Sequence, residues 1–391
     1  MYSLTKDGKF VIENYNWETS FSNFLPGIAG RFGIPMWVYY VSRNQGIISL
    51  GVRDKNHQIM EFLSFNKALE LAGIQGFRTF LKIKGKVYEP FIKTDDKSVS
   101  QTMTVSSEEL VIEEINKKSG ITTEVIYFPI TNSNYPGFVR QVRFKNNTGK
   151  TIKLEFADGL PKILPYGMDI HCVNTIARHV EGMMQTVTLE GAPLFRLKQT
   201  AADTEQIGKI EGGNYYLSSV GEKNRKNKIN YIVDPSLIFG ESEVYTYPWN
   251  FKEFPLSSIL KQPQVMQNKT PSAMTCGEFS LKPGGEFTLN TVIGYAKTDK
   301  IFKNIIKDTK KKDFFARKRE ENIKLIQDIK DNSKTISADI KFDRFCEQNF
   351  LDNVIRGGMP AVYPTASDKT AFYLYSRQNG DLERDYHFFI V

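Results

Sequence analysis

Residues 372–391 contain the densest group of side chains that could do chemistry. Arg377, Arg384 and Asp385 lie between two aromatic clusters, where solvated charge is out of place. Guanidinium groups suit phosphate or carboxylate because they form paired hydrogen bonds, and an adjacent Arg–Asp pair offers donors and acceptors to sugar hydroxyls. The block therefore predicts a binding site for a phosphate or a sugar. A partly buried ion-pair network at the start of a helix explains the same residues equally well.

The chain stops soon after this block, on the apolar run 387–391. Natural C-termini are usually polar and frayed. We therefore expect that an element is cut part-way, and that most of a catalytic domain lies beyond Val391.

Other groups of residues favour structural roles. The glycine-rich stretch 24–37 lacks the Gly-Lys-Ser/Thr of a P-loop and the preceding strand of a dinucleotide fold, so a folded loop that approaches another domain is favoured. Residues 158–161 and 165–167 are typical of a structured loop that leaves a strand at 152–157. Some aromatic side chains could stack on sugars, although most aromatic residues of a β-sandwich are core; these are Tyr215, Tyr216, Trp249 and Phe251.

Metal and nucleophilic chemistry have little support. His171, Cys172 and His179 match no common zinc spacing, and no fourth ligand lies nearby, so we expect no metal. The sequence has no G-x-S-x-G motif, and Cys276 has no obvious partner histidine.

Charge and composition exclude several classes of protein. The net charge is +8, but the basic residues are spread along the chain, and the run Lys310–Lys312 is best explained as a solvated helix face, so no nucleic-acid partner is expected. The N-terminus has no apolar signal region and no apolar run is long enough to span a membrane. Three separated cysteines indicate reduced thiols. We expect a cytoplasmic protein without a membrane partner.

Residues 8–296 have the pattern of strands, with short apolar or alternating runs bounded by Gly, Pro, Asn and Asp. One predicted hairpin joins 138–145 to 152–156, and a second joins 279–281 to 287–289. So many antiparallel strands predict a mainly β fold with a large antiparallel two-sheet β-sandwich. Further strands are expected at 37–42, 46–52, 79–84, 109–115, 122–128, 184–190, 214–220 and 290–296.

The pattern then changes to helix. Apolar residues recur at helical spacing over 299–332, and a shorter helix is expected over 339–356, ended by the Gly-Gly-Met-Pro sequence at 357–360. Phe342, Phe345 and Leu351 are among the expected apolar positions of the second helix. The architecture is thus a sandwich, a helical linker and the opening of a helical domain.

Four blocks in this order resemble the cellobiose phosphorylase family of inverting glycoside phosphorylases and related oligoglucan phosphorylases. They are P-G-I-A-G…G-I-P-M-W (26–37), D-G-L-P…P-Y-G (158–167), N-F-L-D-N-V-I-R-G-G-M-P (349–360) and Y-S-R-Q-N-G-D-L-E-R-D-Y-H-F-F (375–389).

The resemblance implies an N-terminal β-sandwich domain (1–298), a helical linker (299–338) and the start of a truncated (α/α)6 catalytic barrel (339–391). In such dimers the sandwich lends a loop to the active site of the neighbouring subunit, so the segment 24–37 or 158–167 could do so in a homodimer of this chain.

The resemblance also implies a mechanism. Inorganic phosphate, a co-substrate rather than a cofactor, attacks the anomeric carbon of a β-linked gluco-oligosaccharide while a carboxylic acid protonates the departing oxygen, giving an α-sugar-1-phosphate. Arg384 and Asp385 match the pair that holds the glucosyl unit in the −1 subsite, and Arg377 is a candidate for phosphate or sugar contact. The general acid is expected beyond Val391, so this piece should be inactive alone.

Two alternatives remain open. The chain could be a non-catalytic carbohydrate-binding or interaction module, in which the terminal block is only structural. It could also belong to a hydrolase or glycosyltransferase of the same architecture, which phosphate dependence of activity would distinguish.

Overall fold

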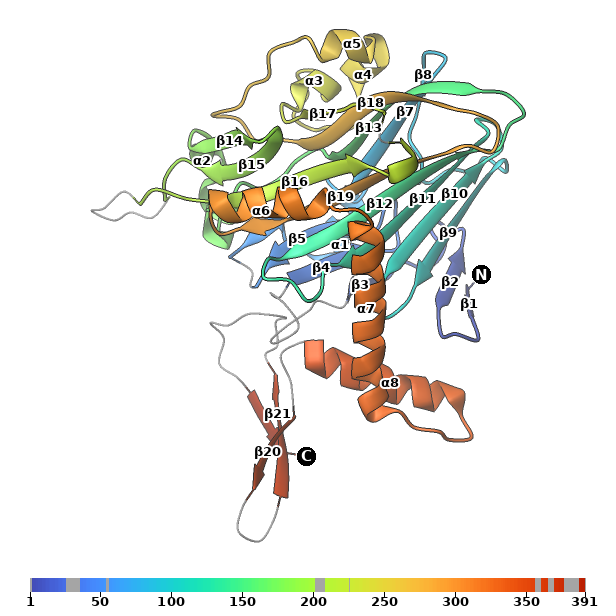
Figure 1. The fold of residues 1–391 in the computed structure, drawn as a ribbon, viewed down its shortest axis with the longest axis vertical. Helices are drawn as coiled ribbons and strands as arrows, with labels where there is room; N and C mark the ends of the chain where they lie inside the picture. The colour runs from blue at the N-terminus through green and yellow to red at the C-terminus, as the bar shows by residue number, and fades with distance from the viewer. Residues whose placement is uncertain are drawn as a thin grey trace.

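The computed structural model describes residues 2–25, 36–53, 56–200, 208–224, 226–355, 360–364, 369–375 and 387–390. Figure 1 shows a layered β-sandwich, from which the α7 helix descends to α8 and a small sheet. This small sheet has three strands. No helix in these ranges is both long and apolar enough to cross a bilayer. The expected mainly β fold with a following helical segment is confirmed, while the (α/α)6 barrel stays a prediction.

One layer of the sandwich is a ten-stranded antiparallel sheet. Its strands alternate between side chains that face the core and side chains that face outward, as at Leu110, Ile112 and Glu114, which are all buried. In spatial order the sheet contains β1 (Tyr2–Leu4), β2 (Phe10–Glu13), β9 (Val99–Val105), β10 (Leu110–Asn116), β11 (Ile121–Pro129), β12 (Gly137–Asn146), β19 (Glu286–Ala296), β16 (Gly213–Val220), β15 (Ala192–Leu197) and β14 (Met184–Leu189).

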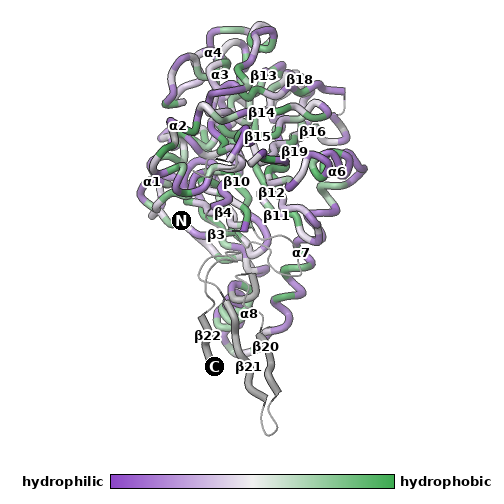
Figure 2. Tube along the Cα trace, turned by 90° about the vertical axis from the view of Figure 1, so that its left-hand side faces the viewer, coloured by the Kyte–Doolittle hydropathy of each residue, from purple (hydrophilic) through white to green (hydrophobic). Residues whose placement is uncertain are grey.

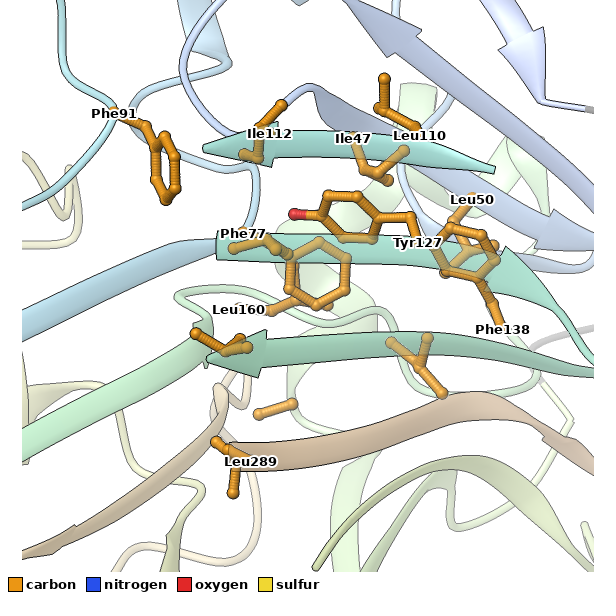
Figure 3. Packing of buried hydrophobic residues seen from close by; sticks show 14 of the residues in the cluster. Ile47, Leu50, Phe77, Phe91, Leu110, Ile112, Tyr127, Phe138, Leu160 and Leu289 are labelled. Atoms are coloured by element: carbon orange, nitrogen blue, oxygen red, sulfur yellow. The ribbon is translucent and has the colours of Figure 1, made fainter. Parts of the chain in front are cut away.

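Two smaller antiparallel sheets form the opposite layer. Phe77, Tyr127 and Phe138 pack together between the layers, with ring centroids 5.8–5.9 Å apart along the series (Figure 3). The five-stranded sheet contains β17 (Ile229–Ile232), β18 (Ala273–Leu281), β13 (Ile152–Leu160), β7 (Arg78–Ile83) and β8 (Lys86–Tyr88), and the four-stranded sheet contains β3 (Ser22–Leu25), β4 (Met36–Val41), β5 (Ile47–Val52) and β6 (Gln58–Met60).

The expected strands are confirmed, but both predicted hairpins are wrong. β12 pairs with β11 and β19 in the ten-stranded sheet, whereas β13, the next strand along the chain, pairs with β7 and β18. The chain therefore crosses from one layer to the other between β12 and β13, and it crosses again between β18 and β19. The two crossings lie beside each other because β12 pairs with β19 and β13 pairs with β18.

Four phenylalanines fill the space between these two crossings. Phe279 and Phe287 stack in parallel at 3.9 Å, Phe144 lies 5.8 Å from Phe279, and Phe156 lies 5.6 Å from Phe287. Each ring comes from the inward face of its strand. The inward side chains of consecutive strands thus meet face to face across the core.

Short helices cover the outer faces of the sandwich. Those near the five-stranded sheet bury Phe239, Phe251 and Ile259 against Phe80 and Cys276. The short helices are α1 (Phe65–Leu71), the π-helical turn η2 (Cys172–Ile176), α2 (Ala177–Glu181), the 3-10 turn η3 (Glu222–Asn224), α3 (Ser236–Phe239), α4 (Trp249–Glu253) and α5 (Leu256–Ile259).

The linker is two helices rather than the single one expected over 299–332. They are α6 (Asp299–Thr309) and α7 (Phe314–Lys330), and α7 is followed by the short 3-10 turn η4 (Asp331–Ser333). The break covers residues 310–313, and Asp313, directly before α7, has a left-handed backbone with φ of 56° that cannot continue an α-helix. The turn lets α6 lie along the ten-stranded sheet while α7 leaves it (Figures 1 and 2).

The expected second helix is confirmed as α8 (Ile340–Ile355), and β20 (Pro360–Pro364), β21 (Lys369–Tyr375) and β22 (His387–Ile390) follow it. These three strands form an antiparallel sheet in which Tyr375 pairs with His387. The strands were not expected from the sequence.

Candidate functional site

The three predicted binding residues lie outside the described residues. Arg377, Arg384 and Asp385 belong to the segment 376–386, which connects β21 to β22. The segment 26–35 of the glycine-rich stretch also lies outside, although its flanking strands β3 and β4 are paired, with Leu25 opposite Val38. Both expectations therefore stay predictions.

The segment 158–167 belongs to the interior of the sandwich. Strand β13 extends to Leu160, so the expected loop begins later than predicted, and Gly159 sits where an added Cβ would meet the Ala273 carbonyl oxygen at 2.1 Å. Beyond the strand, the Leu164 amide donates to the Ile59 carbonyl at 2.9 Å. Because most of this segment is packed inside the fold, it is a poor candidate for a loop that reaches a neighbouring subunit.

Asp158 is part of a buried ionic network that joins the two layers. Its carboxylate pairs with the Arg140 guanidinium at 2.5 Å, and both side chains are fully buried. The Thr79 hydroxyl donates to the same carboxylate at 2.7 Å, and Arg140 also donates to the Gln45 side-chain oxygen. Burial lowers the pKa of Arg140, but the charge and hydrogen bond of Asp158, together with the nearby Tyr127 and Tyr216, raise that pKa overall. A closed network without contact to solvent holds the layers in register and does no chemistry.

The sequence already contained a signal for this network. Arg140 follows Phe138 and precedes Val142 on the alternating pattern of β12, so it occupies an inward position. A charged residue at an inward position requires a buried partner. The partner itself could not be found from spacing, because Asp158 lies on a strand of the opposite layer.

The cysteines and histidines considered as ligands or nucleophiles do not form a site. Within the described ranges, no group of three or more His, Cys, Asp or Glu side chains could hold a metal ion. Cys276 is fully buried, and this burial raises the pKa of its thiol far above the usual range. A thiol that stays protonated and inaccessible is not a nucleophile.

The aromatic candidates divide into core and surface. Tyr215, Tyr216 and Phe251 are fully buried, and the Tyr215 hydroxyl donates to the Pro136 carbonyl at 2.7 Å. These three residues are therefore core, as the general rule for a sandwich predicts. Trp249 is different because 51% of it is exposed, and Tyr247 lies beside it with ring centroids 4.7 Å apart.

A groove of about 580 Å³ lies where the turn between α6 and α7 meets the outer face of the ten-stranded sheet. Several of its polar side chains are already paired: the Gln141 amide donates to Asn290 at 2.7 Å, and Arg143 lies 3.3 Å from Glu124. Phe314, at its rim, is buried. Phe315, the other aromatic residue of the lining, is half-buried, whereas Trp249 is exposed. The surface at Trp249 is therefore the better candidate for a sugar.

The linker is attached to the sandwich by specific polar contacts. Asp299 at the start of α6 pairs with Arg196 at 2.8 Å. On α7, Arg319 forms two hydrogen bonds of 2.7 Å to the carboxylate of Glu109, and the Asn322 amide donates to the Glu108 carbonyl at 2.8 Å. Paired guanidinium–carboxylate bonds fix orientation as well as distance. The direction in which α7 leaves the sandwich is therefore defined.

The α8 helix packs on the far end of α7 and leaves one apolar face uncovered. Ile326 and Ile329 of α7 bury Leu351 of α8. Phe342 and Phe345 are exposed to 54% and 65%. They lie one helical turn apart, so they share a face of the helix. An apolar helix face of this kind is typical of a surface that packs against another helix.

Comparisons with known proteins give weak likenesses. No protein-family model matches the chain. No curated protein matches its sequence. Similar solved structures include a bacterial glucoamylase complexed with acarbose (10% identity, TM-score 0.40, 88% of this chain and 44% of that one) and a polysaccharide lyase (10%, 0.39, 71% and 34%). A family GH92 α-mannosidase from Bacteroides thetaiotaomicron is a third (12%, 0.37, 90% and 43%).

The chain spans less than half the length of each of these three structures. At such identities and TM-scores the likenesses carry no argument about function.

Proposed function

We propose that this chain supplies the β-sandwich and helical linker of an inverting glycoside phosphorylase that acts on β-linked gluco-oligosaccharides. The four sequence blocks that resemble the cellobiose phosphorylase family support this function. The observation that carries it is the exposed apolar face of α8 at Phe342 and Phe345. A helix held at a defined place by α7, with an uncovered apolar face, suits the first helix of a helical catalytic domain.

The proposed reaction transfers a glycosyl unit from the oligosaccharide to inorganic phosphate. A phosphate oxygen forms a bond to the anomeric carbon as the bond to the glycosidic oxygen breaks, and a carboxylic acid gives its proton to the departing oxygen. Phosphate is already anionic and needs a basic pocket more than a general base. In this proposal Arg384 and Asp385 hold the glycosyl unit, and Arg377 contacts phosphate or sugar.

The sandwich contributes rigidity to this reaction rather than reacting groups. The ion pair between Arg140 and Asp158 fixes the two layers, and the pair between Arg319 and Glu109 fixes the linker on them. Catalysis requires that reacting groups be held within fractions of an ångström. A firmly jointed sandwich and linker give a helical domain such a support.

The test is an assay of the protein, as isolated from its source, with β-linked gluco-oligosaccharides and inorganic phosphate. We expect phosphate-dependent formation of an α-sugar-1-phosphate, which ³¹P NMR detects directly, and its loss in Arg384→Ala. The isolated 391-residue chain should give no product. Release of reducing sugar without phosphate would instead identify a hydrolase, and product formation by the isolated chain would show that the catalytic acid lies within it.

A further inference from the structure

The segment between β17 and β18 carries an aromatic corner that the fold does not need for its core. The planes of the Tyr247 and Trp249 rings are inclined at 61° to each other, and the ring centroids lie 4.7 Å apart. These two rings form the aromatic corner. Tyr247 is 37% exposed and Trp249 is 51% exposed. The core position of this segment is filled by Phe251, which is fully buried against Phe80. The Trp249 ring is thus displayed rather than packed.

The corner is held rigidly by cations of the sheet below it. The buried Lys82 ammonium donates to the Phe251 and Phe254 carbonyls, each at 2.7 Å, at the end of α4. Arg78, also buried, donates to the carbonyl oxygens of Tyr245 and Thr246, just before Tyr247. Fixing the backbone on both sides of the two rings reduces the entropy that a ligand must remove on binding.

A pocket of about 380 Å³ lies beside the corner, between α3, α4 and α5. Such a volume is within the range of small-ligand sites. Asn250, which directly follows Trp249 in the chain, and Phe254, which is 52% exposed, both line it. The lining also includes carboxylate, amide and hydroxyl groups, namely Asp234, Glu241, Ser258 and Gln262.

The chemistry of the lining selects a neutral polyhydroxylated ligand. Among the described residues, the pocket lining contains no lysine or arginine, and Lys269 beside it is paired with Asp234 at 2.7 Å. The Lys252 ammonium lies 5.7 Å from the Trp249 ring centroid, but it is paired with Glu253 at 2.9 Å. An anionic ligand would meet the carboxylates without compensation. Carboxylates accept hydrogen bonds from sugar hydroxyls, and amides both accept and donate them, while exposed aromatic rings cover the apolar C–H face of a pyranose.

We propose that the corner of Tyr247 and Trp249, together with the pocket lined by Asn250, Phe254 and Glu241, binds a neutral oligosaccharide chain. The site needs no catalytic residue and no phosphate. This inference rests on the proposed function only for the identity of the sugar, a β-linked gluco-oligosaccharide. Such a site would keep that sugar close to the enzyme.

The test is titration of the 391-residue chain with cellotetraose and laminaritetraose, followed by calorimetry and tryptophan fluorescence. Trp249→Ala should weaken binding by about tenfold, equivalent to ~1.4 kcal/mol, and Trp249→Phe should keep most of the affinity. Trp17→Ala is the matched control, because Trp17 is 56% exposed and lies elsewhere, beside Lys93. Its loss should leave binding unchanged. Tetragalacturonate, an anionic oligosaccharide, should bind more weakly than the neutral sugars.

Two results would overturn the inference: no binding of either neutral tetrasaccharide by the wild-type chain, or equal affinity in wild type and a folded Trp249→Ala variant. Circular dichroism establishes that the variants are folded. Loss of phosphorolysis in Arg384→Ala with intact sugar binding concerns only the proposed enzyme activity. Intact phosphorolysis without sugar binding at Trp249 contradicts only this inference.

Discussion

Arg140 of β12 and Asp158 of β13 form a fully buried ion pair, 2.5 Å between nitrogen and oxygen, that joins the two layers of the sandwich. Removing one member of a buried pair leaves an uncompensated charge and typically costs about 3–5 kcal/mol. We expect Asp158→Ala to lower the free energy of unfolding by this amount, as measured by urea denaturation.

The surface pair of Lys153 and Glu278 is the matched control for this prediction. Its side chains are 71% and 60% exposed, so Glu278→Ala should change stability by less than about 1 kcal/mol. Equal effects of the two substitutions would show that the buried pair does not stabilise the joined layers.

Glu114 gives the protein a pH-dependent stability. It is buried among Gln101, Phe91 and Tyr15, and burial raises the pKa of its carboxyl to about 7, although the Phe91 amide hydrogen bond opposes this rise. The folded state therefore keeps a proton that the unfolded state loses near pH 4.5. This contribution to stability is full at low pH and falls as the pH rises from about 4.5 to 7.

Glu114→Gln should remove that fall in stability. The Gln oxygen can keep both donors, the Phe91 amide and the Gln101 side chain. The Gln amide would replace the second Glu114 oxygen, which has no partner among the described residues. Relative to wild type, we expect the variant to gain on the order of 3 kcal/mol between pH 5 and 8. Chemical denaturation at several pH values measures it. A difference between the two proteins that is constant with pH would contradict the prediction, and the outward-facing Glu113→Gln should alter the slope less.

The pair of Arg319 and Glu109 should control how firmly α7 is held on the sandwich. Hydrogen bonds to charged groups contribute about 1.5–3 kcal/mol each, so Arg319→Ala should raise amide hydrogen exchange in α7 by about tenfold or more. The sandwich strands should keep their protection. Arg317→Ala is the control, because the ion pair of Arg317 is with Glu321 of the same helix. Unchanged exchange in Arg319→Ala would mean that the other contacts of α7, such as the hydrogen bonds of Asn322 to Glu108 and of Lys318 to Thr131, are enough to hold it.

The exposed face of α8 should make the isolated chain bind apolar probes. We expect Phe342→Ser together with Phe345→Ser to reduce the fluorescence of a bound apolar dye and to reduce self-association, with little change in the melting temperature, because both rings are exposed. Leu351→Ser should instead destabilise the contact between α7 and α8, since Leu351 is fully buried. Dye binding that persists in the double variant would place the apolar surface elsewhere.

Whether a segment forms a helix or a strand could in many places be predicted from the spacing of its apolar residues. Alternation located the longest strands of the sandwich, such as β11, β12 and β19, but it missed β1, β2, β3, β6, β8, β9, β15 and β17. The 3.6-residue period located α8 almost to its ends. The period did not reveal the break at Asp313, because apolar positions recur on both sides of it. It also did not predict which apolar residues of α8 are covered, since Phe342 and Leu351 are equally apolar and only the position of α7 distinguishes them.

Strand pairing and the buried network were decided only by the tertiary structure. An alternating strand, a turn and a second alternating strand predict a hairpin, yet β12 and β13 lie in opposite layers. The sequence pattern is the same in both cases, because side chains alternate with a period of two whether the next strand lies alongside or across the core. The layer in which each strand lies is decided by partner strands that are distant in the chain. β19 lies beside β12 and β18 lies beside β13, and this pairing brings Arg140 and Asp158 together.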